Sequence, residues 1–164
     1  MKAVSAPGSA FRSENEWVRP TSAKVFVGMT IFSVRLIIQS EKLSGKEIAS
    51  ALGAKPDVVL EKGEPLSPRS PEPVRKSSRV DFFALSGEGD QDEDRLDEHL
   101  DDLVPHLEKL ADSEVCADVE SSVLIGMRAR AMGNVVFFEP SFLAAAARAN
   151  AALSVDAYPP LSTE

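Results

Sequence analysis

The sequence lacks the features that mark secreted, membrane-spanning and nucleic-acid-binding proteins. It has a single cysteine, Cys116, which excludes an internal disulfide and is typical of a reducing compartment. No stretch approaches the ~20 apolar residues of a membrane-spanning helix, and the first residues lack the apolar core of a secretory leader. Basic residues number 18 against 26 acidic ones, whereas phosphate contacts require clustered Lys and Arg. We therefore expect a cytoplasmic protein that binds neither membranes nor nucleic acids.

The residues that are present are typical of one globular domain. The chain has 164 residues, of which 43% are hydrophobic and 27% charged, enough for one substantial core. Residues 1–22 show no period and predict a flexible N-terminal tail. The domain is expected over residues 23–158, followed by a C-terminal tail over residues 159–164.

Acidic residues are concentrated in one part of the chain. Fourteen of the 26 acidic residues, but only two of the 18 basic ones, lie between Glu88 and Glu120. This segment carries a formal charge of −12 and the rest of the chain +4, giving the net −8. A concentrated negative field of this kind affects the choice of partner, the solubility and the encounter rate, but it does not identify a partner.

Periodic patterns in the first half predict a strand, a short helix and a brief strand. The pattern is extended over residues 24–39, and residues 32–39 alternate with a period of two, which indicates a strand with one face in the core. Ser44 and Glu47 have the spacing of a capping box, and Gly53 followed by Pro56 marks the end of the helix. Residues 58–60 then predict a short strand.

Residues 64–79 predict an exposed basic loop. Four prolines and four serines interleave there, and each proline removes a backbone donor. Two overlapping PxxP spacings leave open a weaker interpretation, in which the loop is a polyproline ligand of an adaptor.

Patterns of leucine, alanine and β-branched residues predict the helices and strands of the second half of the chain. Residues 80–85 predict a strand, and residues 92–111 a long helix with one leucine face, in which Pro105 lies opposite the leucines and leaves the buried face unbroken. Strands are expected at residues 115–125, 135–138 and 153–157. A turn with a positive patch is expected at residues 126–133, and a helix that begins at a proline is expected at residues 140–150. This order predicts an α+β fold: a two-layer sandwich with a ferredoxin-like core, an added strand–helix–strand unit, and helices on one face of a mostly antiparallel sheet.

Several short motifs, in this order, resemble a known family. The strand at residues 30–38 precedes a helix ending in Leu52-Gly53, then Lys62-Gly63-Glu64, an aromatic strand, the acidic helix and a final segment over residues 153–158. The chain is similar over residues 27–158 to the uncharacterised, mainly bacterial family called domain of unknown function 4279. It departs from that pattern at Phe82 and Phe83, where a tryptophan is expected. The resemblance implies domain limits but brings no catalytic residues.

No motif predicts a catalytic, cofactor or metal site. Residues 90–94 alternate acids like the start of a calcium loop, but the sixth position is Arg95 where glycine is required. His99 and His106 are seven residues apart, whereas a zinc-binding helix such as HExxH places two histidines four apart. Cys116 lacks flanking glycine or basic residues and is interpreted as an inert small side chain.

The acidic helix is the remaining candidate surface. Its outer face is predicted to carry Asp94, Asp97, Glu98, Asp101 and Asp102. Two interpretations stay open: a solvated face, neutralised in part by the basic loop, or a surface for a basic protein partner. We favour a non-catalytic interaction domain, for example an immunity or antidote protein that covers the basic cleft of a toxin. The alternative is an enzyme or small-ligand domain with a pocket between the sheet and the loops, including the turn with Arg128 and Arg130.

Overall fold

The computed structural model describes residues 29–67, 69–86, 96–129 and 136–158. The two predicted tails, residues 23–28, the acidic run at residues 90–94 with Asp94, and Arg130 lie outside these ranges. The elements of the main body are β1 Met29–Ser40, α1 Gly45–Leu52, β2 Val58–Leu60, β5 Ser78–Ser86, α2 Leu96–Ala111, β6 Glu120–Ala129, α3 Pro140–Arg148 and β7 Ala151–Tyr158. A short hairpin, β3 Pro65–Ser67 and β4 Ser70–Val74, and the 3-10 helix η1 Glu114–Asp118 complete the described part.

A five-stranded sheet forms the centre of the molecule. Its strand order is β2-β5-β1-β6-β7, and β3 and β4 form a separate two-stranded sheet. The first three pairings of the main sheet, β2 with β5, β5 with β1 and β1 with β6, are antiparallel, while β6 and β7 are parallel. The described chain is therefore a mixed α+β structure with a mostly antiparallel sheet, as its element order predicts.

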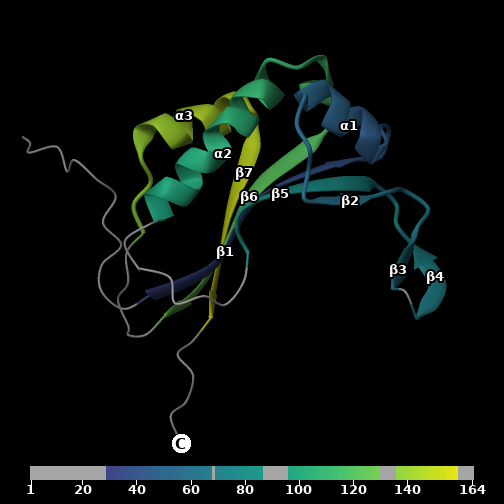
Figure 1. Ribbon diagram of the computed structural model, residues 1–164, viewed down its shortest axis with the longest axis horizontal. Helices are drawn as coiled ribbons and strands as arrows, with labels where there is room; N and C mark the ends of the chain where they lie inside the picture. Colours follow the sequence, from purple (N-terminus) through teal and green to yellow (C-terminus); the bar gives the residue numbers. More distant parts are fainter. Residues whose placement is uncertain (1–28, 68, 87–95, 130–135, 159–164) are drawn as a thin grey trace, which may run out of the picture.

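The core lies between the sheet and the helices. Successive side chains of a strand point to opposite faces, so Val34, Leu36 and Ile38 of β1 share one face and are fully buried. The same cluster includes the leucines of α2 and Phe142 of α3. Figure 1 shows α1, α2 and α3 on the same side of the sheet. The opposite face of the sheet, called here the open face, carries the alternate residues.

Helix α1 has the ends that its sequence predicts. Ser44 accepts from the backbone N–H of Glu47, while the Glu47 carboxylate accepts from that of Ser44, which completes the capping box. Gly53 ends the helix with φ 55°, a left-handed conformation that suits glycine. These contacts also hold the pKa of Glu47 below its ordinary value, because the Ser44 N–H and hydroxyl favour the charged form.

Helix α2 continues through its proline. Pro105 is exposed, and the leucines on the other side stay buried from Leu96 to Leu110. The proline therefore leaves the packed face intact, as predicted, because its missing N–H and its ring lie toward solvent.

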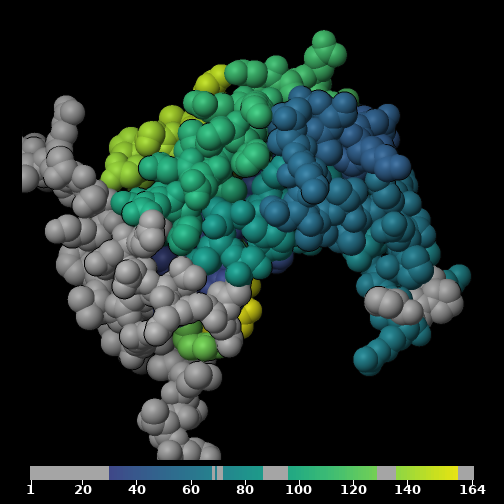
Figure 2. Space-filling model, in the orientation of Figure 1, coloured from purple at the N-terminus to yellow at the C-terminus, as the bar shows by residue number. Residues whose placement is uncertain are grey.

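The proline-rich segment was predicted as a loop, and this prediction was wrong. β3 and β4 pair antiparallel, with Pro65 opposite Val74 and Ser67 opposite Ser70. Both strands of a two-stranded ribbon are edge strands, and a proline whose nitrogen faces the unpaired side loses no ladder hydrogen bond. Figures 1 and 2 show this hairpin standing out from the body of the molecule, at the lower right of both views.

Three boundaries in the second half also differ from the predictions. Residues 114–118 form η1, so the predicted strand begins only at Glu120, and Cys116 lies in the 3-10 helix. Residues 136–138 form no strand. The turn predicted from Gly126 is instead the continuation of β6 to Ala129. Gly126 lies against the ring of Phe32, which a Cβ atom would meet at 2.7 Å, so the glycine here allows a close approach and does not mark a turn. Arg128 therefore belongs to a strand.

Candidate functional site

Helix α2 holds four of the five predicted acidic residues on its outer side. Its five leucines are at most 2% exposed, which fixes the rotation of the helix against the sheet. Glu98, Asp101 and Asp102 are exposed and Asp97 is half-buried. We call these four residues the α2 acidic surface. Figure 2 shows α2 at the molecular surface between α1 and α3.

The basic residues of the hairpin do not lie against this surface. Arg69 occupies the turn between β3 and β4, and Arg75 directly follows β4. Figure 1 shows the hairpin beyond α1, away from α2. One ion pair near the end of α2 joins Asp112 to Arg148, whose nitrogen lies 2.7 Å from the carboxylate, and both side chains are more than half exposed. Neutralisation of α2 by the hairpin, one of the sequence-based interpretations, therefore finds no support in the described residues.

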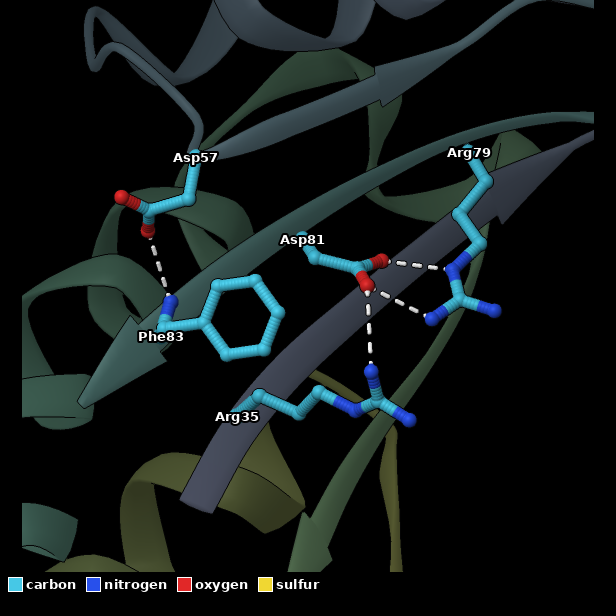
Figure 3. Close-up of polar contacts among 5 residues, drawn as sticks. All are labelled: Arg35, Asp57, Arg79, Asp81 and Phe83. Atoms are coloured by element: carbon cyan, nitrogen blue, oxygen red, sulfur yellow. Dashed lines mark hydrogen bonds and ion pairs between the residues drawn. The ribbon is translucent and has the colours of Figure 1, made fainter. Parts of the chain in front are cut away.

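The structure also brings together a cluster that sequence reasoning missed, on the open face. Asp81 is 2% exposed and its two oxygens accept from Nε and Nη2 of Arg79, both at 2.6 Å (Figure 3). Arg35 on β1 approaches the same carboxylate at 3.6 Å and lies 5.7 Å from the centroid of the Phe83 ring. Phe83 is directly opposite Arg35, and its N–H donates to Asp57 at 2.8 Å. We call Arg35, Asp81 and Arg79 the arginine–aspartate cluster.

The cluster holds two guanidinium groups around one carboxylate. Hydrogen bonding to Asp81 raises the pKa of Arg79 above its ordinary value, so Arg79 stays charged. Nε of Arg35 is buried and has no hydrogen-bond partner among the described residues. The signal in the sequence is the spacing of Arg79, Asp81 and Phe83 by two, which places all three on one face of a strand.

The described surface has hollows, of which three lie near ends of its helices and strands. One of about 310 Å³ lies where β1 ends and β6 begins, and includes Lys42 and Asp118, which form an ion pair. Another of about 340 Å³ lies beside it near Asn150, and a third of about 560 Å³ lies between the C-terminal ends of α1 and α2. Neither Cys116 nor the arginine–aspartate cluster lines any of them. Hydrogen bonding to Asp118 raises the pKa of Lys42, which makes that lysine a charged group and not a base.

The remaining sequence candidates are separate from one another. The Sγ atom of Cys116 is half-buried and 4.0 Å from the carbonyl oxygen of Ala149. His106 stacks on Phe82 with ring centroids 4.4 Å apart, and burial together with Lys109 lowers its pKa. Among the described residues no group of three or more His, Cys, Asp or Glu is arranged to hold a metal ion. Within the same residues, no helix has the length and apolar character to cross a membrane.

Comparison with known families gives one match. The family model described as a domain of unknown function (DUF4279) matches residues 29–160, which is most of the chain. The chain belongs to the DUF4279 family. The resemblance of the ordered motifs to this family is thus confirmed. No curated protein and no solved structure matches the DUF4279 chain.

Proposed function

We propose that this DUF4279 protein is a non-catalytic interaction domain that binds a basic protein surface through the α2 acidic surface. The observation that carries the proposal is the exposure of Glu98, Asp101 and Asp102 on a helix whose opposite face is fixed by buried leucines. An immunity or antidote protein that covers the basic cleft of a toxin is the specific form we favour.

Electrostatics supports a basic partner. Asp97 with Asp101, and Glu98 with Asp102, are like charges four residues apart, and each such pair costs roughly 0.2–0.5 kcal/mol on a helix. The basic hairpin lies elsewhere (Figure 1), so it does not relieve this repulsion, and a basic partner bound at the exposed face would lower it. A rigid acidic face would also accelerate encounter with a basic partner, and added salt would slow that encounter.

The test is a charge-neutralising variant of the full-length protein. The variant carries Asp97→Asn, Glu98→Gln, Asp101→Asn and Asp102→Asn. A matched control removes the same charge elsewhere, with Glu41→Gln, Glu64→Gln, Glu114→Gln and Glu120→Gln, all at exposed positions. Partners are captured from the host lysate on the immobilised protein across a salt series, and the association rate of the captured partner is then measured with each variant.

We expect the α2 variant to lower the association rate by about tenfold or more and to flatten its salt dependence, because both effects arise from long-range charge. The control variant should change the rate much less. A captured partner whose affinity is indifferent to both salt and the α2 variant would refute the proposal.

We infer in addition that the main sheet is a ferredoxin-like core in a two-layer sandwich, extended by the α3–β7 unit. The strand order β2-β5-β1-β6 with antiparallel neighbours supports it, since that order is the split βαβ arrangement. Nuclear Overhauser contacts between β2 and β5 and between β1 and β6 test it, and a different set of strand neighbours would exclude it.

A second candidate function is binding of a small anion, which the arginine–aspartate cluster favours. Two guanidinium groups surround one carboxylate, and Arg35 has donors that Asp81 does not fully engage. NMR titration with phosphate and with benzoate would detect such a site through shifts of β1 and β5 amides. Shifts that persist in Arg35→Gln would count against it.

A further inference from the structure

Strand β7 leaves one edge of the main sheet open. It is the last strand in the order β2-β5-β1-β6-β7 and pairs on one side with β6 over residues 151–158. No described strand pairs with its other side. Residues 152–158 are all exposed. An edge strand of this length presents a row of unpaired N–H and C=O groups, which is a template for another strand.

The composition of β7 does not block such pairing. Proteins usually protect an open edge with lysine, proline, a bulge or a very short strand. The sequence of β7 is AALSVDAY, which contains no lysine or proline and one charge, Asp156. Its pairing with β6 runs without a break in register from Ala151 to Tyr158. The edge is therefore long, regular and nearly neutral.

Exposed apolar side chains line the same edge. Leu153 and Val155 pair with the core residues Val123 and Ile125, so they lie on the helix-covered face, yet they are 37% and 41% exposed. Leu143 of α3 is exposed to 44% on that side of the sheet. These side chains are incompletely covered, and no strand of the described residues lies beyond β7.

We propose that β7 pairs antiparallel with β7 of a second copy of this chain, around a two-fold axis at Ser154. Opposite residues in an antiparallel pair share a face, so this axis places Leu153 opposite Val155 of the partner strand, and the reverse. The exposed apolar side chains of the two edges then meet as two equivalent pairs. The two sheets join into one continuous sheet.

Charge at the edge also favours a second copy over a charged peptide. Asp156 falls opposite Ala152 of the other copy in this register, so the only carboxylate of the strand meets no like charge. The acidic helix α2 packs over β1 and β5, while α3 packs beside β7, so the dimer brings together the two α3 sides and keeps the α2 acidic surfaces apart. The pairing leaves the α2 acidic surface available and does not depend on the function proposed for it.

The first test measures self-association of the full-length protein by analytical ultracentrifugation over a concentration series. Leu153→Lys adds an edge charge at the centre of the predicted interface and should weaken dimerisation by about tenfold or more. Leu66→Lys is the matched control, because Leu66 is 52% exposed on the distant hairpin, and it should leave the dimer unchanged. Higher salt should not weaken the dimer, in contrast to binding of a basic partner.

The second test measures the register. In a Cys116→Ser background, Ser154→Cys places two thiols directly opposite each other, with Cβ atoms about 4.5–5.5 Å apart, near disulfide distance. Ala152→Cys, on the same face, separates them by on the order of 13 Å. Mild oxidation should therefore cross-link the first variant and not the second.

Three outcomes would overturn the proposal: a monomer at all concentrations, a dimer that Leu153→Lys does not weaken, or equal cross-linking at positions 152 and 154. The circular dichroism spectrum of each variant is the folding control. An unchanged spectrum would show that a change in association does not come from a loss of folding.

Discussion

At the scale of single residues, the arginine–aspartate cluster has the largest energetic consequence. Asp81 is a buried carboxylate that belongs to no hydrophobic pattern, and its burial depends on the side chains of Arg79 and Arg35 lying over it. Removing one partner from a buried ion pair leaves an uncompensated charge, which costs more than the pair itself contributes. The arginine–aspartate cluster therefore restricts which residues can occupy its three positions on the open face of the sheet.

We predict that Asp81→Asn lowers the free energy of unfolding by about 2–3 kcal/mol, a value below that of a fully buried pair because the arginines are a quarter exposed. Asp112→Asn is the control: it removes the same type of charge from an exposed pair with Arg148 and should cost less than about 1 kcal/mol. Urea unfolding measures both. Equal costs would show that Asp81 is not held by its arginines.

His106 predicts a pH dependence of stability. Burial and Lys109 lower its folded pKa below 6.5, while Asp57 opposes this shift. The unfolded chain therefore takes up the proton first as the pH falls, so the contribution of His106 is present above about pH 6.5 and is lost below it. Wild-type protein should lose stability more steeply than His106→Gln between pH 7.5 and the folded pKa, as measured by urea midpoints at each pH. Parallel pH profiles would contradict this assignment.

At the scale of elements, the hairpin and β7 show what edge strands can tolerate. β3 and β4 contain prolines and project from the body, whereas β7 is regular and apolar. The backbone of Arg75 bonds that of Glu64 at 2.8 Å, so the two ends of the hairpin are already adjacent. The hairpin is thus an addition to the sheet and not a part of its core.

We predict that replacing residues 65–74 with Asn-Gly leaves the domain folded, because that dipeptide closes a two-residue turn between adjacent chain ends. The melting temperature should change by less than roughly 5 °C, since an isolated two-stranded ribbon adds little stability. A variant with a Gly-Ser segment of the original length separates the effect of chain length from that of sequence. Loss of cooperative unfolding in both variants would show that the hairpin supports the sheet.

At the scale of the whole molecule, charge and apolar surface lie on different elements. The α2 acidic surface lies above the centre of the sheet, and the nearly neutral β7 forms one of its edges. Added salt should weaken binding of a basic partner at the first and should not weaken self-pairing at the second. One salt series therefore distinguishes the two proposed interactions.

Local pattern was sufficient for much of this architecture. The capping box of α1, the leucine face of α2 and the alternation of β1 were predicted from residues close in sequence, and the structure confirms each. Predictions failed at the proline-rich segment, at residues 115–118, at the turn expected from Gly126 and at residues 136–138, where a strand was expected. In these segments the conformation depends on which strand or helix lies beside the backbone N–H groups. The local sequence does not show which elements those are.

The sequence by itself determined the α+β class, the family, and the outward position of Glu98, Asp101 and Asp102, because periodicity and capping act within a few residues. Only the tertiary structure decided that Arg35 meets Asp81 from another strand, that the basic hairpin lies away from α2, and that β7 has an open edge. These features arise from strand order, and strand order is set by long-range pairing that local pattern does not encode.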